Sequence, residues 1–406
     1  MNLFNNIVFK GIEGKIMEEI KLKRALFVGM YPNEVNKYRN VFFQNLIFAI
    51  ADLGIECTVI SPVPVTKYLS KIKEIPKSEI HKTSKGNTVE VYYPRYISAS
   101  SKQIGKFNTE KISEASFESA ALKVAKKLKG QYDFVYGHFV LYGGLAAINI
   151  GNMLRIPSFF AYGECDFKTE VGNTYGIPKE KEIAGLKGVI SVSKKNTDEL
   201  SKLGFIGSTP VITAPNSTDL SLFYRRNKDV CRKKLGIPLD KYVIGFVGGF
   251  IERKGDKRLL KAVNQLDDVY IAFAGRGAEP PKGEKVVFCQ AMEHEKIPIL
   301  LNAVDVFVLP TLAEGSCNAI VEAMACGLPI ISSDLPFNDD VLTEKNSIRI
   351  DPMSIEQIRD AVERLRDDEL RNRMGEEAFL TAQELSIENR AWKILEFISE
   401  QVEEVV

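Results

Sequence analysis

The chain has 406 residues, a net charge of +1 and 45% hydrophobic residues, as expected of an ordinary soluble globular protein of two or three domains. No stretch approaches the ~18 consecutive apolar residues of a membrane-spanning helix. The start of the chain lacks the basic and apolar segments of a secretory signal. The six cysteines are far apart and only three histidines occur. These features argue against a disulfide scaffold or a zinc site and favour a reducing cytoplasm.

The small net charge hides an asymmetry between the two halves of the chain. Residues 1–205 contain 29 basic against 20 acidic residues, a net of +9, and residues 206–406 contain 25 against 33, a net of −8. The halves therefore look like different domains. A basic half favours an anionic partner such as an acidic acceptor, a membrane surface or nucleic acid, although a solvated lysine-rich surface gives the same count.

Short apolar segments alternate with amphipathic stretches along the first half. The apolar segments are typical of strands buried on both faces, and the stretches between them are long enough for helices. The predicted strands are residues 25–30, 57–61, 133–136, 158–161, 188–192 and 211–213, and the predicted helices are 41–53, 110–128, 142–154 and 194–203. This alternation predicts right-handed βαβ units and a parallel sheet.

The same alternation restarts after residue 207. The predicted strands are residues 242–247, 269–274, 285–288, 304–309, 329–332 and 348–350, with helices at 256–265, 293–301 and 318–326. Three further helices, at 354–366, 367–384 and 386–403, complete the chain. The fold class is therefore α/β, with two facing Rossmann-like, doubly wound domains and C-terminal helices. Because such sheets bind ligands at the carboxyl ends of their strands, we expect the active site in the interdomain cleft.

Residues 310–333, PTLAEGSCNAIVEAMACGLPIISS, are the most informative segment. A buried strand ends there, and a helix begins near Asn318, so the amides of residues 316–319 suit an anion or sugar hydroxyls. Glu314 lies before this helix and Glu322 about one turn inside it, among apolar neighbours. Both carboxylates can face one ligand and accept hydrogen bonds from vicinal hydroxyls. A loop carboxylate and a solvated helix residue are the structural alternative.

Two glycine-containing loops follow predicted strands of the second half. In VGGFIERKG, Gly248 and Gly249 allow close approach of a ligand to the backbone, and Lys254 can reach a diphosphate as a mobile point charge. This order of residues is not a P-loop. In AGRG, Gly275 and Arg276 suggest a backbone approached by a flat ligand such as a base, although Arg276 can also be a solvated loop residue.

In the first half, His138 follows a predicted strand and should therefore face the cleft, although a lone histidine is more often structural. No G-x-S-x-G segment and no D-x-D pair occurs. We therefore expect no metal and no cofactor.

These residues together resemble the GT-B-fold retaining glycosyltransferases of family 4, the glycosyl transferases group 1 type, from about residue 23 to about residue 400. The most specific part is the E-x7-E motif, here Glu314 to Glu322 within AVDVFVLPTLAEGSCNAIVEAMACGLPI. The segments FVGGFIERKG, AGRG and TAPNSTDLSLF support the resemblance, as does the opening YPNEV…FFQNLIFAIADLGIECTVISP.

The resemblance implies a role for each matching residue. Glu314 would contact the donor sugar, Glu322 the ribose hydroxyls, Lys254 the diphosphate, and His138 would lie near the reacting sugar. The amides of the following loop would hold sugar and phosphate. The expected catalytic residues are Glu314, Lys254 and His138, and the expected donor-binding residues are Glu322, Gly248, Gly249, Arg253, Gly275, Arg276, Gly315, Ser316, Cys317 and Asn318.

The sequence departs from the family pattern near Lys254. The family commonly has an arginine five residues before that lysine, where this chain has Gly249, and Arg253 is a candidate to compensate. The family's first glycine-rich loop is replaced by residues 36–40, which include Lys37 and Arg39.

The sequence therefore predicts a cytoplasmic, metal-independent retaining glycosyltransferase. It would move a hexose-type sugar from a UDP- or GDP-linked donor to a hydroxyl acceptor, in assembly of a cell-surface polysaccharide or glycolipid. The alternatives are a GT-B-fold epimerase or phosphorylase and a degenerate, non-catalytic GT-B protein.

The resemblance and the charge asymmetry also predict a domain organisation and a second partner. We expect an acceptor-side domain at 1–205, with an extension at 1–23, a donor domain at 206–385, and a helix at 386–406 that crosses back. Lysines interleave with apolar residues at 67–77 and 123–129, as in an amphipathic surface helix. Peripheral contact with the anionic inner membrane face is the resulting hypothesis, with no role for nucleic acid.

Overall fold

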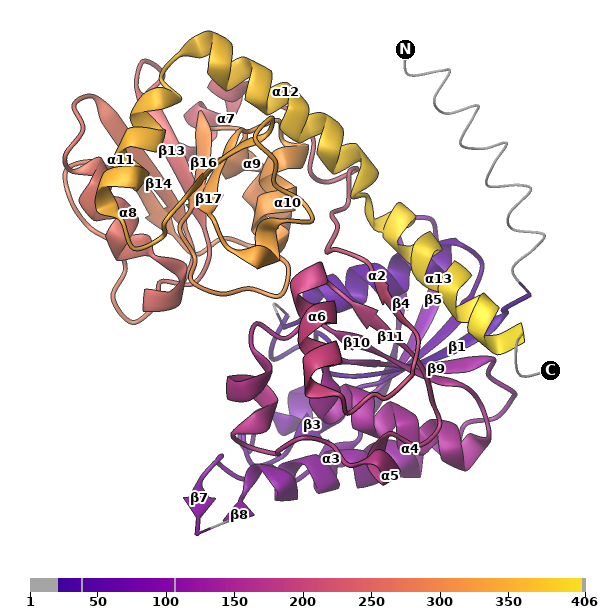
Figure 1. Cartoon of the computed structure of the whole chain (residues 1–406). Helices are drawn as coiled ribbons and strands as arrows, with labels where there is room; N and C mark the ends of the chain where they lie inside the picture. Colours follow the sequence, from indigo (N-terminus) through magenta and orange to yellow (C-terminus); the bar gives the residue numbers. More distant parts are fainter. Residues whose placement is uncertain (1–20, 38, 106, 404–406) are drawn as a thin grey trace.

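The computed structural model describes residues 21–37, 39–105 and 107–403, which contain two large sheets with helices on both faces and two small two-stranded sheets (Figure 1). The predicted extension at 1–23 lies almost wholly outside the described residues. The two doubly wound domains predicted from the sequence are confirmed. Each sheet forms because its central strands are almost entirely apolar and buried on both faces.

The first sheet has eight strands in the order β12-β11-β10-β9-β1-β2-β5-β4, and all neighbours are parallel except β4 and β5. Its strands are β1 (Arg24–Val28), β2 (Glu56–Ile60), β4 (Ser78–Lys82), β5 (Thr88–Tyr92), β9 (Phe134–His138), β10 (Ser158–Tyr162), β11 (Leu186–Ser191) and β12 (Val211–Thr213). The principal helices are α2 (Val41–Asp52), α3 (Glu110–Ala125), α4 (Leu145–Leu154) and α6 (Lys194–Leu203), and a short α5 (Glu180–Ile183) precedes β11. Because β12 pairs with β11, this sheet extends beyond the boundary predicted at residue 205.

The second sheet has six parallel strands in the order β15-β14-β13-β16-β17-β18. They are β13 (Tyr242–Val247), β14 (Val269–Ala274), β15 (Val286–Gln290), β16 (Val306–Leu309), β17 (Ile330–Ser333) and β18 (Ser347–Ile350). The helices are α7 (Lys228–Leu235), α8 (Asp256–Val263), α9 (Ile297–Leu301), α10 (Asn318–Ala325), α11 (Ile355–Arg364) and α12 (Asp368–Glu384).

The chain passes twice between the domains, and the two passages pair with each other. The Thr218 amide donates to Leu385 O at 3.1 Å, and the Ile387 amide donates to Thr218 O at 2.9 Å. Beyond this point α13 (Ile387–Glu403) lies on the first domain, where Ile394 and Ile398 join the apolar cluster of α2 (Figure 1). The end of the chain therefore helps to hold the two domains together.

Two local predictions were wrong, and one pair of strands was missed. The antiparallel pair β4–β5 was not predicted, because its five-residue strands alternate in burial and are joined by a turn containing Gly86, with φ +91°. Residues 67–77 form no amphipathic helix, since only η1 (Ile72–Glu74) is helical there. The helix predicted from residue 142 begins at Leu145, after the irregular segment η2 (Phe139–Gly144), in which Leu141 and Tyr142 have non-helical backbone angles.

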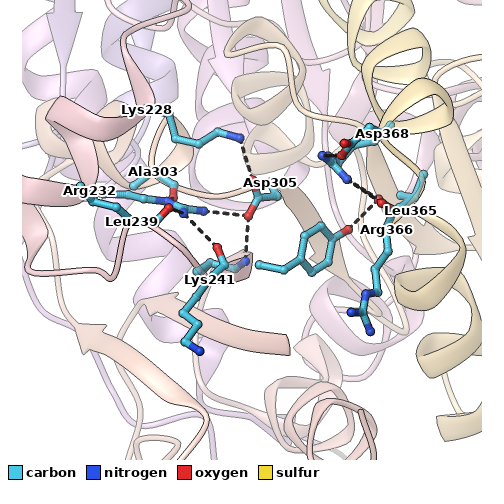
Figure 2. Close-up of polar contacts among 12 residues, drawn as sticks. Lys228, Arg232, Leu239, Lys241, Ala303, Asp305, Leu365, Arg366 and Asp368 are labelled. Carbon is cyan, nitrogen blue, oxygen red and sulfur yellow. Dashed lines mark hydrogen bonds and ion pairs between the residues drawn. The ribbon is translucent and has the colours of Figure 1, made fainter. Parts of the chain in front are cut away.

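A buried ion pair fixes α7 to the second sheet. Arg232 is 3% exposed and donates to Asp305 Oδ2 at 2.7 Å and to the carbonyl oxygens of Ala303 and Lys241 (Figure 2). The same carboxylate accepts the Val243 amide at 2.8 Å. The Asp305 carboxylate, just before β16, thereby connects the beginning of β13 with Arg232 of α7.

We predict that Asp305→Ala lowers the free energy of unfolding by about 3 kcal/mol, because it leaves the Arg232 guanidinium buried without its carboxylate. Chemical denaturation measures this loss. The matched control is Lys228→Met, whose ammonium pairs with Asp305 at 2.6 Å but is 46% exposed. The control should cost less than about 1 kcal/mol, and an equal loss in both variants would contradict the assignment.

Candidate active site

The carboxyl ends of both sheets face a cavity of about 340 Å³ between the domains. It is lined by Phe42, His138, Phe139, Gly163, Cys165, Val192, Asn216, Val247, Gly248, Gly249, Lys254, Glu314, Gly315, Ser316, Cys317, Asn318, Ala319 and Glu322. The domains touch directly at its edge, where the Asn216 side chain donates to Ser316 O at 2.9 Å. A Cβ at Gly315 would lie 2.4 Å from Gly163 O, so this close approach requires a glycine.

Glu314 is the most heavily bonded side chain of the cavity. It is 7% exposed, and its Oε1 accepts from Lys254 Nζ at 2.5 Å and from Thr311 Oγ1 at 2.8 Å, and lies 3.1 Å from Arg253 Nη1. Burial alone would lower the pKa of Lys254, but neighbouring Cys317 and Glu314 raise it overall. Lys254 is therefore a buried cation, held against a carboxylate at the cavity wall.

The loops after β13 and β14 are hydrogen-bonded to each other. The Phe250 amide donates to Arg276 O at 2.8 Å, and a Cβ at Gly275 would lie 1.9 Å from Gly248 O. Gly248 and Gly249 line the cavity, whereas Gly275 and Arg276 do not. The glycine at 275 is needed because the neighbouring loop packs against it, and a ligand at that backbone stays a prediction.

Glu322 lies on α10, is 7% exposed, and faces both this cavity and a larger neighbouring one of about 500 Å³. His294 Nε2 lies 2.8 Å from Glu322 Oε1, and the imidazole packs against the Phe223 ring at 5.2 Å. Burial would lower the pKa of His294, but the hydrogen bond and charge of Glu322 raise it overall. His294 was not among the residues predicted from the sequence, because its partner lies 28 positions further along the chain.

His138 ends β9 on the opposite wall. It is 5% exposed and packed among the rings of Phe42, Phe43 and Phe139, at 5.1, 4.8 and 4.5 Å. Burial, and then the nearby Arg390 charge, lowers its pKa to about 3, so the imidazole is neutral near pH 7. Phe139 has φ +67°, an uncommon backbone conformation that is found more often at functional sites.

A third cavity, of about 250 Å³, adjoins the other side of His138 within the first domain. Its lining includes Glu110, Glu164 and Glu170. Glu164 accepts the amides of Val140 at 2.7 Å and Gly163 at 2.9 Å, and burial raises its pKa to about 8. A buried carboxyl group of the basic first domain therefore lies in the cavity that adjoins His138.

The structure brings most of the predicted residues together. His138, Gly248, Gly249, Lys254, Glu314, Gly315, Ser316, Cys317, Asn318 and Glu322 line one cavity, and Arg253 contacts it through Glu314. Among the described residues, no group of three or more His, Cys, Asp or Glu side chains is arranged to hold a metal ion, and no helix is long and apolar enough to cross a membrane.

The sequence comparisons agree with this geometry. Residues 227–381 match the family described as glycosyl transferases group 1. TuaC of Bacillus subtilis, a glycosyltransferase named for teichuronic acid biosynthesis, is 27% identical over 365 residues, or 86% of this chain and 90% of TuaC. The resemblance to the group 1 glycosyltransferases and the prediction of a glycosyltransferase are therefore confirmed.

Solved structures show the same GT-B fold. Sucrose-phosphate synthase of Thermosynechococcus elongatus superposes with a TM-score of 0.73 at 19% identity, over 95% of this glycosyltransferase and 100% of that chain. HepE of Anabaena, solved with UDP-glucose, gives a TM-score of 0.65 at 16% identity, over 93% and 100%.

We predict that His294→Gln destabilises the enzyme more at about pH 5.5 than at about pH 9. The pKa of His294 is higher in the fold than its ordinary 6.5, so its contribution is complete below that value and is lost as the pH rises through the raised value. Melting temperatures across this range measure the difference. The exposed neighbour variant Lys296→Gln should show no such trend, and a constant deficit in His294→Gln would contradict the prediction.

Proposed function

We propose that this enzyme is a retaining, metal-independent glycosyltransferase that moves a hexose-type sugar from a UDP- or GDP-linked donor to a hydroxyl acceptor. The observation that carries the proposal is the Lys254–Glu314 pair, which faces His138 across one interdomain cavity. The UDP-glucose bound to HepE supports a nucleotide-sugar donor, and the name of TuaC supports an acceptor in polysaccharide assembly.

In the proposed reaction, the bond between the sugar C1 and the diphosphate oxygen breaks, and the electron pair leaves with the diphosphate. Lys254 and the loop amides before α10 stabilise the developing negative charge. The acceptor hydroxyl bonds to C1 from the same face, and its proton passes to a phosphate oxygen of the leaving group. His138, which is neutral, binds a sugar hydroxyl, and Glu314 orients the sugar.

Purified enzyme should be screened with UDP- and GDP-sugars by thermal shift and then assayed with a chelator present. A matching donor at 100 times its Kd should stabilise the fold by about 2.7 kcal/mol. The product should retain the anomeric configuration, and turnover should persist in chelator. Activity that requires added Mg²⁺ would refute metal independence, and the absence of binding by every nucleotide sugar would refute the proposal as a whole.

We predict that Lys254→Met lowers kcat by roughly 10²- to 10³-fold with a much smaller change in donor KM, because leaving-group charge is greatest in the transition state. Steady-state kinetics separate the two parameters. Lys261→Met, which removes an exposed lysine from α8, is the matched control and should behave like the unmodified enzyme. An effect confined to KM would contradict this role of Lys254.

We further propose that the basic first domain contacts an anionic membrane surface. The interleaved apolar residues Tyr68, Ile72, Val124 and Leu128 pack against the core, so they are not free for lipid. Leu69 remains exposed, as do apolar residues of the small hairpin formed by β7 (Gln103–Ile104) and β8 (Phe107–Asn108).

Sedimentation with vesicles tests this contact. Binding to anionic but not neutral vesicles is expected, with about 1 kcal/mol per lysine near the surface and a steep loss with added salt. Equal binding to both vesicle types, or none at low salt, would contradict the membrane contact and leave the catalytic proposal untouched.

A further inference from the structure

The larger interdomain cavity contains a buried arginine with unsatisfied donors. Arg390 is 6% exposed, lines this cavity, and its buried Nε and Nη2 atoms have no hydrogen-bond partner. Among the described residues, no carboxylate lies within ion-pair distance of it. Burial of a guanidinium without a counter-charge is energetically costly. The position of Arg390 therefore indicates that an anionic ligand supplies the missing hydrogen-bond acceptors.

Two hydroxyl groups beside Arg390 share this condition. Ser217 Oγ and Thr218 Oγ1 are buried without a partner, and both residues line the same cavity. The backbone explains why they lie near Arg390. Thr218 pairs with the residues that begin α13, through the Ile387 amide at 2.9 Å, so the interdomain crossing brings these three residues to the same cavity.

The wall formed by the first domain adds further positive potential. Arg39 and the first residues of α2, Val41 and Phe42, line the cavity. The amides of the first helical turn lack partners within the helix, and Asn40 provides no side-chain cap for them. A helix of 12 residues therefore directs the positive end of its dipole at the space beside Arg390.

We propose that Arg390, Ser217 and Thr218 form a binding site for phosphate oxygens in the larger cavity. A planar guanidinium offers paired donors that match an oxyanion, and hydroxyl groups add single donors. Asp219, His294 and Glu322 line the same cavity. These groups suit the hydroxyls of a ligand that also carries the phosphate.

The phosphate has two potential sources, the diphosphate of the nucleotide donor and free inorganic phosphate. The larger cavity shares Phe42, Asn318 and Glu322 with the cavity that contains Lys254. A nucleotide bound at Glu322 would therefore extend toward both cations. The nucleotide source rests on the proposed function, whereas the phosphate site itself does not.

Isothermal titration of the full chain with UDP, GDP, uridine, guanosine and inorganic phosphate tests the site. If the diphosphate is the ligand, Arg390→Gln weakens nucleoside diphosphate binding roughly ten- to hundredfold and leaves nucleoside binding unchanged. If free phosphate is the ligand, only phosphate binding is lost. Arg390→Lys should restore part of the affinity, because it keeps the charge but not the planar fork.

The matched control is Lys393→Gln, which removes an exposed charge one turn along the same helix and should bind every ligand normally. The site is refuted if Arg390→Gln binds diphosphates and phosphate like the unmodified chain, or if it loses nucleosides and diphosphates equally. Phosphate binding that depends on Arg390 in a chain that binds no nucleotide would support the site and refute the proposed donor.

Discussion

The carboxylate of Glu314 is the interaction on which the catalytic cleft depends. Its Oε1 accepts hydrogen bonds from Lys254 and Thr311 and forms an ion pair with Arg253. Beside this cluster, the Leu312 amide donates to Arg253 O at 2.8 Å. These contacts join the loop after β13 to the loop after β16. Because both loops follow buried strands, the pair holds the two loops in a fixed geometry. A buried charge pair is seldom a large source of stability, but it specifies where the cation lies.

This arrangement bears on how a donor would bind. Lys254 is neutralised by Glu314 in this structure, so a diphosphate would have to share or replace that carboxylate. The positive charge of Lys254, which would stabilise the leaving group, is thus paired with Glu314 until a donor binds. Preorganisation of this kind reduces the reorganisation required at the reacting bond.

The sequence predicted the strands well because they are short, apolar and buried on both faces, so local composition determines them. It also predicted that Glu314, Glu322, Lys254 and His138 lie near one another, because parallel strands bring their carboxyl ends to one edge. It could not predict which groups pair. His294 reaches Glu322 from a separate turn, and the packing of Gly275 depends on a neighbouring loop.

Arg390 was missed for a similar reason, although the sequence contains a signal for it. In α13 the buried positions 387, 391, 394 and 398 follow a helical stripe, and Arg390 lies on that stripe at an apolar position. An arginine there must either pair or face a cavity. Other residues of its cavity lie far earlier in the chain, on α2 and at positions 217–219. Only the three-dimensional structure therefore shows whether Arg390 pairs with another side chain or faces a cavity.

The net charge of each half therefore does not predict the charge of the residues that it places at the cleft. The first domain is basic overall, yet it presents a neutral His138 to the cleft, with the buried carboxyl of Glu164 in the adjoining cavity. The acidic second domain supplies Lys254 and Arg253. The net charge of a domain comes mostly from exposed side chains, whereas the potential in a cleft depends on the few buried charged groups that line it. A phosphate in the smaller cavity is thus favoured beside the second domain, and the first domain contributes positive potential where α2 and α13 meet the larger cavity.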